Sequence, residues 1–165
     1  MKTIDLSLPR SAIFSNDRKY RYALWRVWNK IHNPLLMIGL NPSTANELSD
    51  DPTITRMISR ANRAGFGSLL MANLYAFVSS NPNVLLGDGE FIGIETDDYL
   101  IQMIELANQV VCGWGSFPAA IKRSHAVLKM IPKPYCLGIN ADGQPKHPLY
   151  ISYDTPMVKF TNTSK

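Results

Sequence analysis

The stretch at residues 34–44, PLLMIGLNPST, joins a short apolar run to a polar loop. The run at 35–40 carries no polar side chain and lies between two turn signals, Asn33-Pro34 and Asn41-Pro42. Such a run is typical of a parallel strand that is covered on both faces. The loop at 39–44 is therefore expected at the carboxyl end of a buried strand, where open α/β sheets bind their ligands.

The same unit, an apolar strand followed by a helix, recurs along the chain. Asp51-Pro52 is a good helix start, because Asp caps the free N–H groups and Pro suits the first turn, and Gly65 is a plausible stop. Alternating strands and helices predict a parallel sheet with helices on both faces. The strands are expected at 35–40, 68–74, 109–113 and 134–138, and the helices at 53–64, 93–107 and 119–130.

The first third of the chain predicts a β-hairpin over residues 11–28, with its turn at 16–19. The expected architecture is a single α/β domain over residues 1–165. It consists of this hairpin, a three-layer α/β/α core over 34–150 with a four-stranded, mainly parallel sheet, and a frayed polar tail over 154–165. The long connection at 75–92 either carries function or contains a short helix.

The composition is that of a folded globular protein, with 45% hydrophobic and 18% charged residues. The two cysteines, Cys112 and Cys136, lie in apolar runs, which favours buried reduced thiols over a cysteine-rich metal or iron–sulfur site. No apolar run approaches the roughly 20 residues of a membrane helix, and the N-terminus lacks a signal core. These features predict a cytoplasmic protein without membrane contact.

Polar residues follow all four predicted parallel strands, and three of them are the main candidates for chemistry. Pro42 holds the preceding Asn41 in an extended conformation, which fixes the direction of its side chain. Asn73 offers both a donor and an acceptor to a base or amide edge, and His147 can stabilise developing negative charge. The remaining candidates for substrate binding are Gly39, Leu40, Pro42, Ser43, Thr44, Tyr75, Trp114 and Pro148.

Each candidate also has a structural interpretation. The loop at 41–44 could be a simple turn, Asn73 could close its strand by bonding the backbone, and His147 could be a structural histidine. Trp114 could be a packing plug or a stacking surface for a planar ligand. Asp50 and Asp51 could bind a metal, but the helix dipole explains two carboxylates at a helix start, so no metal is expected.

A net charge of +4 is compatible with a polyanionic partner but does not require one. Arg56, Arg60 and Arg63 recur on one predicted helix, where they form either a solvated face or a track for a phosphate backbone. Contacts with nucleic acid are expected from Arg56, Arg60 and Lys146. A second basic cluster surrounds the hairpin and is interleaved with aromatic residues; it consists of Arg10, Arg18, Lys19, Arg21 and Arg26.

Several segments together closely resemble the DUF1643 family of bacteria and phages. They are RYALWRVW at 21–28, IGLNPSTA at 38–45, DDPT at 50–53, NLYA at 73–76 and DGQPKHPLY at 142–150. The resemblance covers almost the whole chain. It identifies a family but not an activity.

A more distant resemblance implies chemistry. The uracil-DNA glycosylase superfamily has a compact parallel sheet with helices on both faces and three motifs, to which residues 39–42, 70–73 and 147–149 are similar in order and placement. By this resemblance Asn41 would orient the attacking water, Asn73 would bind the base, and His147 would stabilise the departing base. Leu149 replaces a motif Ser that contacts DNA phosphate, so a free nucleoside or nucleotide is an alternative substrate.

The resemblance implies a DNA glycosylase-like enzyme that hydrolyses the N-glycosidic bond of a modified or deaminated base, without a cofactor or an obligatory protein partner. A base in a duplex would first be flipped out at a cost of a few kcal/mol. Two alternatives stay open: an enzyme acting on nucleosides or nucleotides with the same pocket, and a non-catalytic module that binds nucleic acid. Fold alone does not decide among them.

Overall fold

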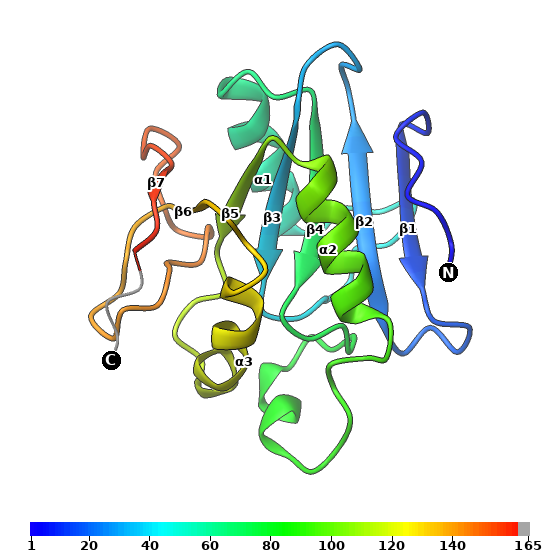
Figure 1. Cartoon of the computed structure of the whole chain (residues 1–165), viewed down its shortest axis with the longest axis vertical. Coiled ribbons are helices and arrows are strands. Elements are labelled where there is room, and N and C mark those ends of the chain that lie inside the picture. Colours follow the sequence, from blue (N-terminus) through cyan, green and yellow to red (C-terminus); the bar gives the residue numbers. More distant parts are fainter. Residues whose placement is uncertain (162–165) are drawn as a thin grey trace.

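The computed structural model describes residues 1–161 and contains one mixed sheet in the order β1-β2-β4-β3-β5-β6-β7 (Figure 1). The helices are α1 (Pro52–Arg63), α2 (Thr96–Leu106), α3 (Pro118–Leu128) and the short 3-10 helix η1 (Pro82–Leu86). The strands are β1 (Arg10–Phe14), β2 (Arg21–Val27), β3 (Pro34–Gly39), β4 (Ser68–Asn73), β5 (Gln109–Cys112), β6 (Pro134–Cys136) and β7 (Val158–Lys159).

The expected α/β class is confirmed, but the sheet has seven strands rather than four. β3 runs parallel to β4 and β5, and β5 runs parallel to β6. The hairpin does not stand apart from this sheet, because β2 pairs antiparallel with β4 and places Leu24 opposite Met71. Six of the seven residues of β2 are buried, so this strand needs neighbours at both edges and cover on both faces.

Helices cover both faces of the sheet, and the alternation of side chains along β3 divides the core between them. Leu35 and Met37 face α1, where they belong to one hydrophobic cluster with Met57. Leu36 and Ile38 belong to the cluster on the opposite face, which includes residues of α2 and α3. Figure 1 shows α1 behind the sheet and α2 and α3 in front of it.

The helix boundaries follow their local signals. The side chain of Asp51 accepts a hydrogen bond from the Ile54 N–H at 2.9 Å, which confirms it as the cap of α1. Gly65, with a φ of +86°, ends that helix region as expected. α2 begins at Thr96 rather than at Gly93, because Gly93 has a φ of +91°. The connection at 75–92 contains η1, one of the two expected possibilities.

Within residues 1–161, no helix combines the length and the apolar composition that crossing a membrane requires.

The prediction of a frayed tail from residue 154 is wrong for the part of that segment around β7. β7 pairs antiparallel with β6, and the Phe160 N–H donates to the Pro134 carbonyl at 2.8 Å. The Phe160 ring is 4% exposed and lies edge-on to Trp114, with the ring centroids 6.2 Å apart. One large apolar side chain thus anchors a polar segment. Residues 162–165 of the predicted tail lie outside the described residues.

We expect Phe160→Ala to lower the free energy of unfolding by about 3 kcal/mol, because it removes a buried aromatic ring and leaves a cavity beside Trp114. Urea unfolding followed by circular dichroism measures this loss. Val158→Ala on the same strand is the matched control, since Val158 is 45% exposed and should change stability by less than about 0.5 kcal/mol. Equal losses for the two variants would contradict this anchoring role.

Candidate functional site

A cavity of about 260 Å³ lies at the carboxyl ends of the parallel strands, which point to the lower end of the molecule in Figure 1. This volume is slightly below the range of about 300–1,000 Å³ that is common for small-molecule pockets. The cavity is lined by residues of β2, the loop at 39–43, the start of α1, the end of β4, the 79–82 segment and the 147–149 loop.

The three main candidates from the sequence meet in this cavity. Asn41, Asn73 and His147 all line it, although they come from distant parts of the chain. Other expected residues that line it are Gly39, Leu40, Ser43 and Trp114. Those that do not line it are Pro42, Thr44, Tyr75 and Pro148. Pro42 and Pro148 are buried in the surrounding packing, while Thr44 is exposed on the outer side of its loop.

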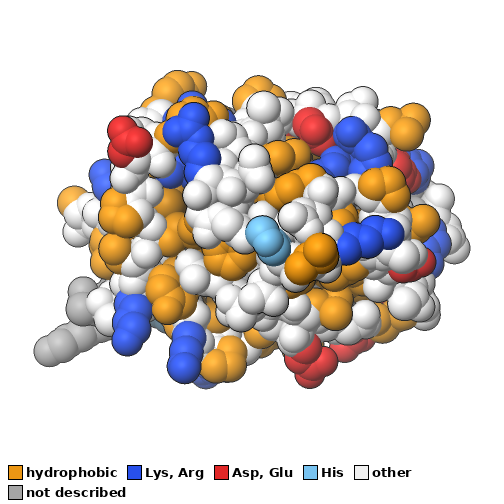
Figure 2. Space-filling view, turned by 90° about the horizontal axis from the view of Figure 1, so that it is seen from above, with side chains coloured by type: hydrophobic (Ala, Val, Ile, Leu, Met, Phe, Trp, Pro, Cys, Tyr) orange, Lys and Arg blue, Asp and Glu red, His pale blue; other side chains and the backbone are white. Residues whose placement is uncertain are grey.

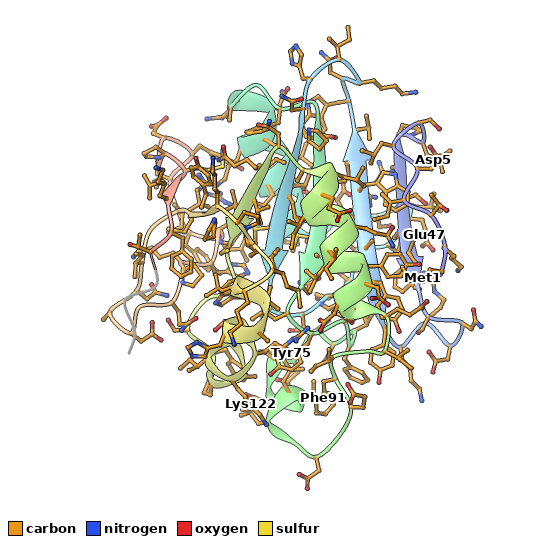
Figure 3. All side chains as sticks on the ribbon, in the orientation of Figure 1. Met1, Asp5, Glu47, Tyr75, Phe91 and Lys122 are labelled. Carbon is orange, nitrogen blue, oxygen red and sulfur yellow. The ribbon has the colours of Figure 1, made fainter. Side chains whose placement is uncertain are left out.

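Tyr75 lies in a different place from the one expected. Its hydroxyl donates to the Ala119 carbonyl at 2.9 Å. It lines a second cavity, of about 610 Å³, together with Phe91 and Lys122, and Figure 3 shows these three side chains beside α3. Because β4 ends at Asn73, the alternation of the strand does not carry Tyr75 to the same side as Asn73.

Asn41 connects two loops of the site. Its amide nitrogen donates to the carbonyls of Ser79 at 2.9 Å and Pro42 at 3.0 Å. The hydroxyls of Ser43 and Ser80, 3.2 Å apart, make a second link between the same loops. These contacts fix the amide of Asn41, and its Oδ1 has no hydrogen-bond partner among residues 1–161. A carbonyl oxygen held in this way can accept a hydrogen bond from a water or a ligand.

Asn73 is held by a buried arginine that lines the same cavity. The Arg21 guanidinium is 3% exposed and donates to the Ala45 carbonyl at 2.9 Å and to Asn73 Oδ1 at 3.4 Å. Burial lowers the pKa of Arg21 to about 10, and the negative charge of Asp51 opposes this shift. At this pKa the guanidinium remains charged at neutral pH.

Gly39 makes room for the Asn73 amide. The two residues are paired in the register of β3 and β4. A Cβ atom on residue 39 would lie 3.0 Å from Asn73 Nδ2 and 3.0 Å from Met71 Cε. A larger residue would therefore displace the amide, which gives this glycine a steric role in the site.

Two charged residues, Arg21 and Asp51, line the cavity and are not among the site residues that the sequence predicts. Arg21 was assigned to a basic surface cluster, but β2 is covered on both faces and buries it. Large side chains on both faces of the predicted strand were the signal that an arginine within it would be buried. For Asp51 the sequence favours a role at the start of the helix over a metal site. Its Oδ1 accepts from the Ile54 N–H, but the residue also lines the cavity and supplies a carboxylate.

His147 is arranged as a neutral hydrogen-bond donor. Its Nδ1 accepts the Leu149 N–H at 3.2 Å, so this nitrogen is unprotonated and the proton of the neutral ring is on Nε2. Burial lowers the pKa of His147 below its ordinary value of 6.5, and the charge of Asp51 opposes this effect. The ring therefore offers an Nε2–H group without a positive charge at neutral pH.

Trp114 lines the cavity. Of the two expected roles, packing in the core and stacking on a planar ligand, its contacts favour packing. Its side chain is 1% exposed, and its Nε1–H donates to Gln144 Oε1 at 2.8 Å. Phe160 packs against the ring edge-on. These contacts leave little of the indole surface for stacking on a ligand.

Two arginines of the basic helix face, Arg56 and Arg60, bind another segment of the chain. Arg56 and Arg60 both donate to the Ile151 carbonyl, and Arg60 also donates to the Ser152 carbonyl at 2.9 Å. The guanidinium of Arg56 lies 4.4 Å from the ring centroid of Tyr153. Arg60 is 4% exposed, which leaves little of its surface for the nucleic-acid contact that the sequence predicts. The sequence spacing could not show that residues 151–153 cover this face.

The hairpin arginines and Lys146 differ in whether they form ion pairs. The hairpin arginines hold the 45–50 loop, since Arg18 pairs with Glu47 at 2.9 Å and Arg26 pairs with Asp50 at 2.8 Å. Lys146 makes no ion pair within the described chain, and its stem lies against Gly138. Figure 2, which views the end of the molecule opposite the cavity, shows Lys and Arg side chains in separate groups among apolar and uncharged ones.

The described residues contain no group of three His, Cys, Asp or Glu side chains that could hold a metal ion. Cys112 and Cys136 are buried free thiols on neighbouring strands, and burial raises the pKa of Cys112.

The model of a family described as "Protein of unknown function (DUF1643)" matches residues 21–149, which include every lining residue of the cavity, and the chain belongs to this family. No curated protein and no solved structure matches the chain.

We expect the free energy of unfolding to decrease as the pH falls from 7 to 5. Because the pKa of His147 is lowered in the folded state, the unfolded chain binds a proton below pH 6.5 that the folded chain resists. His147→Gln should flatten this dependence, which urea unfolding at several pH values measures. His125→Gln, at an exposed position of α3, is the matched control and should keep the wild-type slope. A wild-type slope in His147→Gln would contradict the buried neutral imidazole.

Proposed function

We propose that this member of the DUF1643 family is a glycosylase-type hydrolase that cleaves the N-glycosidic bond of a modified or deaminated base. The observation that carries the proposal is that Asn41, Asn73 and His147 line one cavity of about 260 Å³. These residues belong to the three motifs that resemble the uracil-DNA glycosylase superfamily. A fold of that superfamily, with the base at the carboxyl ends of the parallel strands, is part of this proposal.

In the proposed reaction Asn41 holds the attacking water. Its amide nitrogen is fixed by the Ser79 and Pro42 carbonyls, so its Oδ1 can accept a hydrogen bond from the water and hold it in one position. The water oxygen forms a bond to the anomeric carbon as the bond from that carbon to the base nitrogen breaks. The electron pair of the broken bond leaves with the base, and the surplus proton of the water restores its neutrality.

His147 stabilises the negative charge on the departing base. Its neutral ring presents Nε2–H, while the Leu149 N–H holds Nδ1 and the orientation of the ring. A fixed donor aimed at developing charge acts strongly in a cavity that is poor in water. Asp51 lines the same cavity, and its carboxylate stabilises the positive charge that develops on the sugar.

The alternative substrate, a free nucleoside or nucleotide, is favoured by a specific observation. Arg56 and Arg60 bind the backbone of residues 151–152, so they are not available to a phosphate backbone. DNA remains our first proposal because the motif resemblance is to DNA glycosylases. The two substrates differ in a measurable property, because DNA binding through phosphate contacts weakens steeply with salt.

We expect Asn41→Ala and His147→Gln each to reduce base release by about 10²–10³-fold, the loss typical of a removed charge-stabilising or positioning group. Chromatography of free bases, released from oligonucleotides and nucleosides that carry deaminated bases, measures the rate. His125→Gln is the control and should act like the wild type. Full activity in His147→Gln would contradict the assigned site, and binding without any base release would favour a non-catalytic module.

Filter binding of single-stranded oligonucleotides at about 50 and 200 mM salt separates the two substrate classes. A DNA enzyme should bind at the lower concentration and lose affinity steeply at the higher one. Lys146→Ala should reduce this salt dependence if Lys146 contacts phosphate. Base release from nucleosides without measurable DNA binding at low salt would instead establish the smaller substrate.

A further inference from the structure

We infer that the cavity prefers a 6-oxopurine, such as hypoxanthine or guanine, over adenine and uracil, because Arg21 and Asn73 present only hydrogen-bond donors to the ligand. The binding preference stands on these two side chains. The use of that preference in cleavage rests on the proposed function.

The orientation of Asn73 follows from its neighbour. A guanidinium can donate hydrogen bonds but cannot accept them, so the amide oxygen of Asn73 must face Arg21. Oδ1 is therefore occupied by Arg21, and Nδ2 is the atom of the amide that can bind a ligand. Nδ2 lies beside Gly39, where a Cβ atom would be 3.0 Å away, and both residues line the cavity. Asn73 therefore offers donor hydrogens, not the donor and acceptor pair that the sequence allowed.

Arg21 is a buried cation that forms no ion pair in the described part of the chain, although the negative charge of Asp51 acts on it. Its side-chain hydrogen bonds go to the Ala45 carbonyl and to Asn73 Oδ1. The guanidinium has more N–H groups than these two contacts use. A buried charge is costly when it is left without acceptors, so a ligand that brings acceptors to this position gains binding energy.

The bases differ in how well they match this pair of donors. A 6-oxopurine presents O6 and N7 as adjacent acceptors, which is the edge that arginine binds most often in nucleic-acid recognition. Adenine replaces O6 with an amino group, so the corresponding edge would place a donor against a donor. Uracil has O4 beside the N3–H donor. Cytosine presents N3 and O2 as adjacent acceptors, so this pair of donors does not exclude it. The 6-oxopurine edge therefore satisfies both Arg21 and Asn73, whereas adenine and uracil each turn a donor toward one of them.

The same donors would assist cleavage. When the bond to N9 breaks, the electron pair passes to the purine ring system and spreads toward N7 and O6. Arg21 is charged at neutral pH and would lie beside these atoms, where its positive charge favours the departing anion over the bound substrate. His147 and Arg21 would then act on the same anion from different sides of the cavity.

Titration calorimetry of the wild-type protein with inosine, guanosine, adenosine, uridine, cytidine and inorganic phosphate tests the preference. We expect inosine and guanosine to bind at least about tenfold more tightly than adenosine and uridine. Equal or tighter binding of uridine or adenosine would overturn the inference. Binding of phosphate without binding of inosine would also overturn the inference, because Arg21 would then bind an anion and would not recognise a base.

The substitution Asn73→Asp replaces one of the proposed hydrogen-bond donors with an acceptor. One carboxylate oxygen would keep the contact with Arg21, and the other would replace the Nδ2 donor with an acceptor. We expect the variant to lose about tenfold or more in inosine affinity and to gain affinity for adenosine. Asn62→Asp, at an exposed position of α1, adds the same charge and should leave the ranking unchanged. An unchanged ranking in a folded Asn73→Asp protein would contradict the inference.

Free bases in the same calorimetry samples are then quantified by chromatography. Tight inosine binding without base release would retain the inference and reject the proposed hydrolysis. Base release from uridine or cytidine, but not from inosine, would retain the proposed function and reject the 6-oxopurine preference. The two conclusions can therefore fail separately.

Discussion

The parallel register between β3 and β4 decides which side chains reach the cavity. Gly39 lies opposite Asn73 at the last pair of this ladder. A slip of one residue would turn every side chain of one strand to the other face, which would place a bulky residue beside the amide and divide the core differently. The two hydrophobic clusters prevent such a slip, since Leu35 and Met37 fill one and Leu36 and Ile38 fill the other. Core packing thereby fixes the position of the site.

Arginines hold the loops around this strand pair by donating to backbone carbonyls. Arg21 binds the Ala45 carbonyl, and Arg26 binds the carbonyls of Asn46 and Ser49. Arg60 binds the segment that follows the His147 loop. Much of the basic character of the chain therefore serves its own loops.

The sequence predicted the elements with strong local signals and the strand ends that meet in the cavity. The apolar run at 35–40 and the cap at Asp51 both correspond to observed elements. Features that depend on distant contacts could not be predicted in the same way. The addition of β2 to the central sheet, the covering of Arg60 by residues 151–152 and the anchoring of Phe160 beside Trp114 all join segments far apart in the chain. No local pattern specifies which distant segment will cover a given face.

The site also shows why residue type alone left its chemistry open. An isolated asparagine can read either a donor or an acceptor, and the sequence offered no means to choose for Asn73. The contact with Arg21 removes that ambiguity, because only the amide oxygen can face a guanidinium. Likewise, the Leu149 N–H determines which nitrogen of His147 carries the proton. Both constraints leave N–H groups free on the two side chains, and both come from neighbouring groups of the chain. The N–H groups of Arg21, Asn73 and His147 suit an electron-rich group, and in the proposed reaction the base becomes more electron-rich as it leaves with the electron pair of its glycosidic bond.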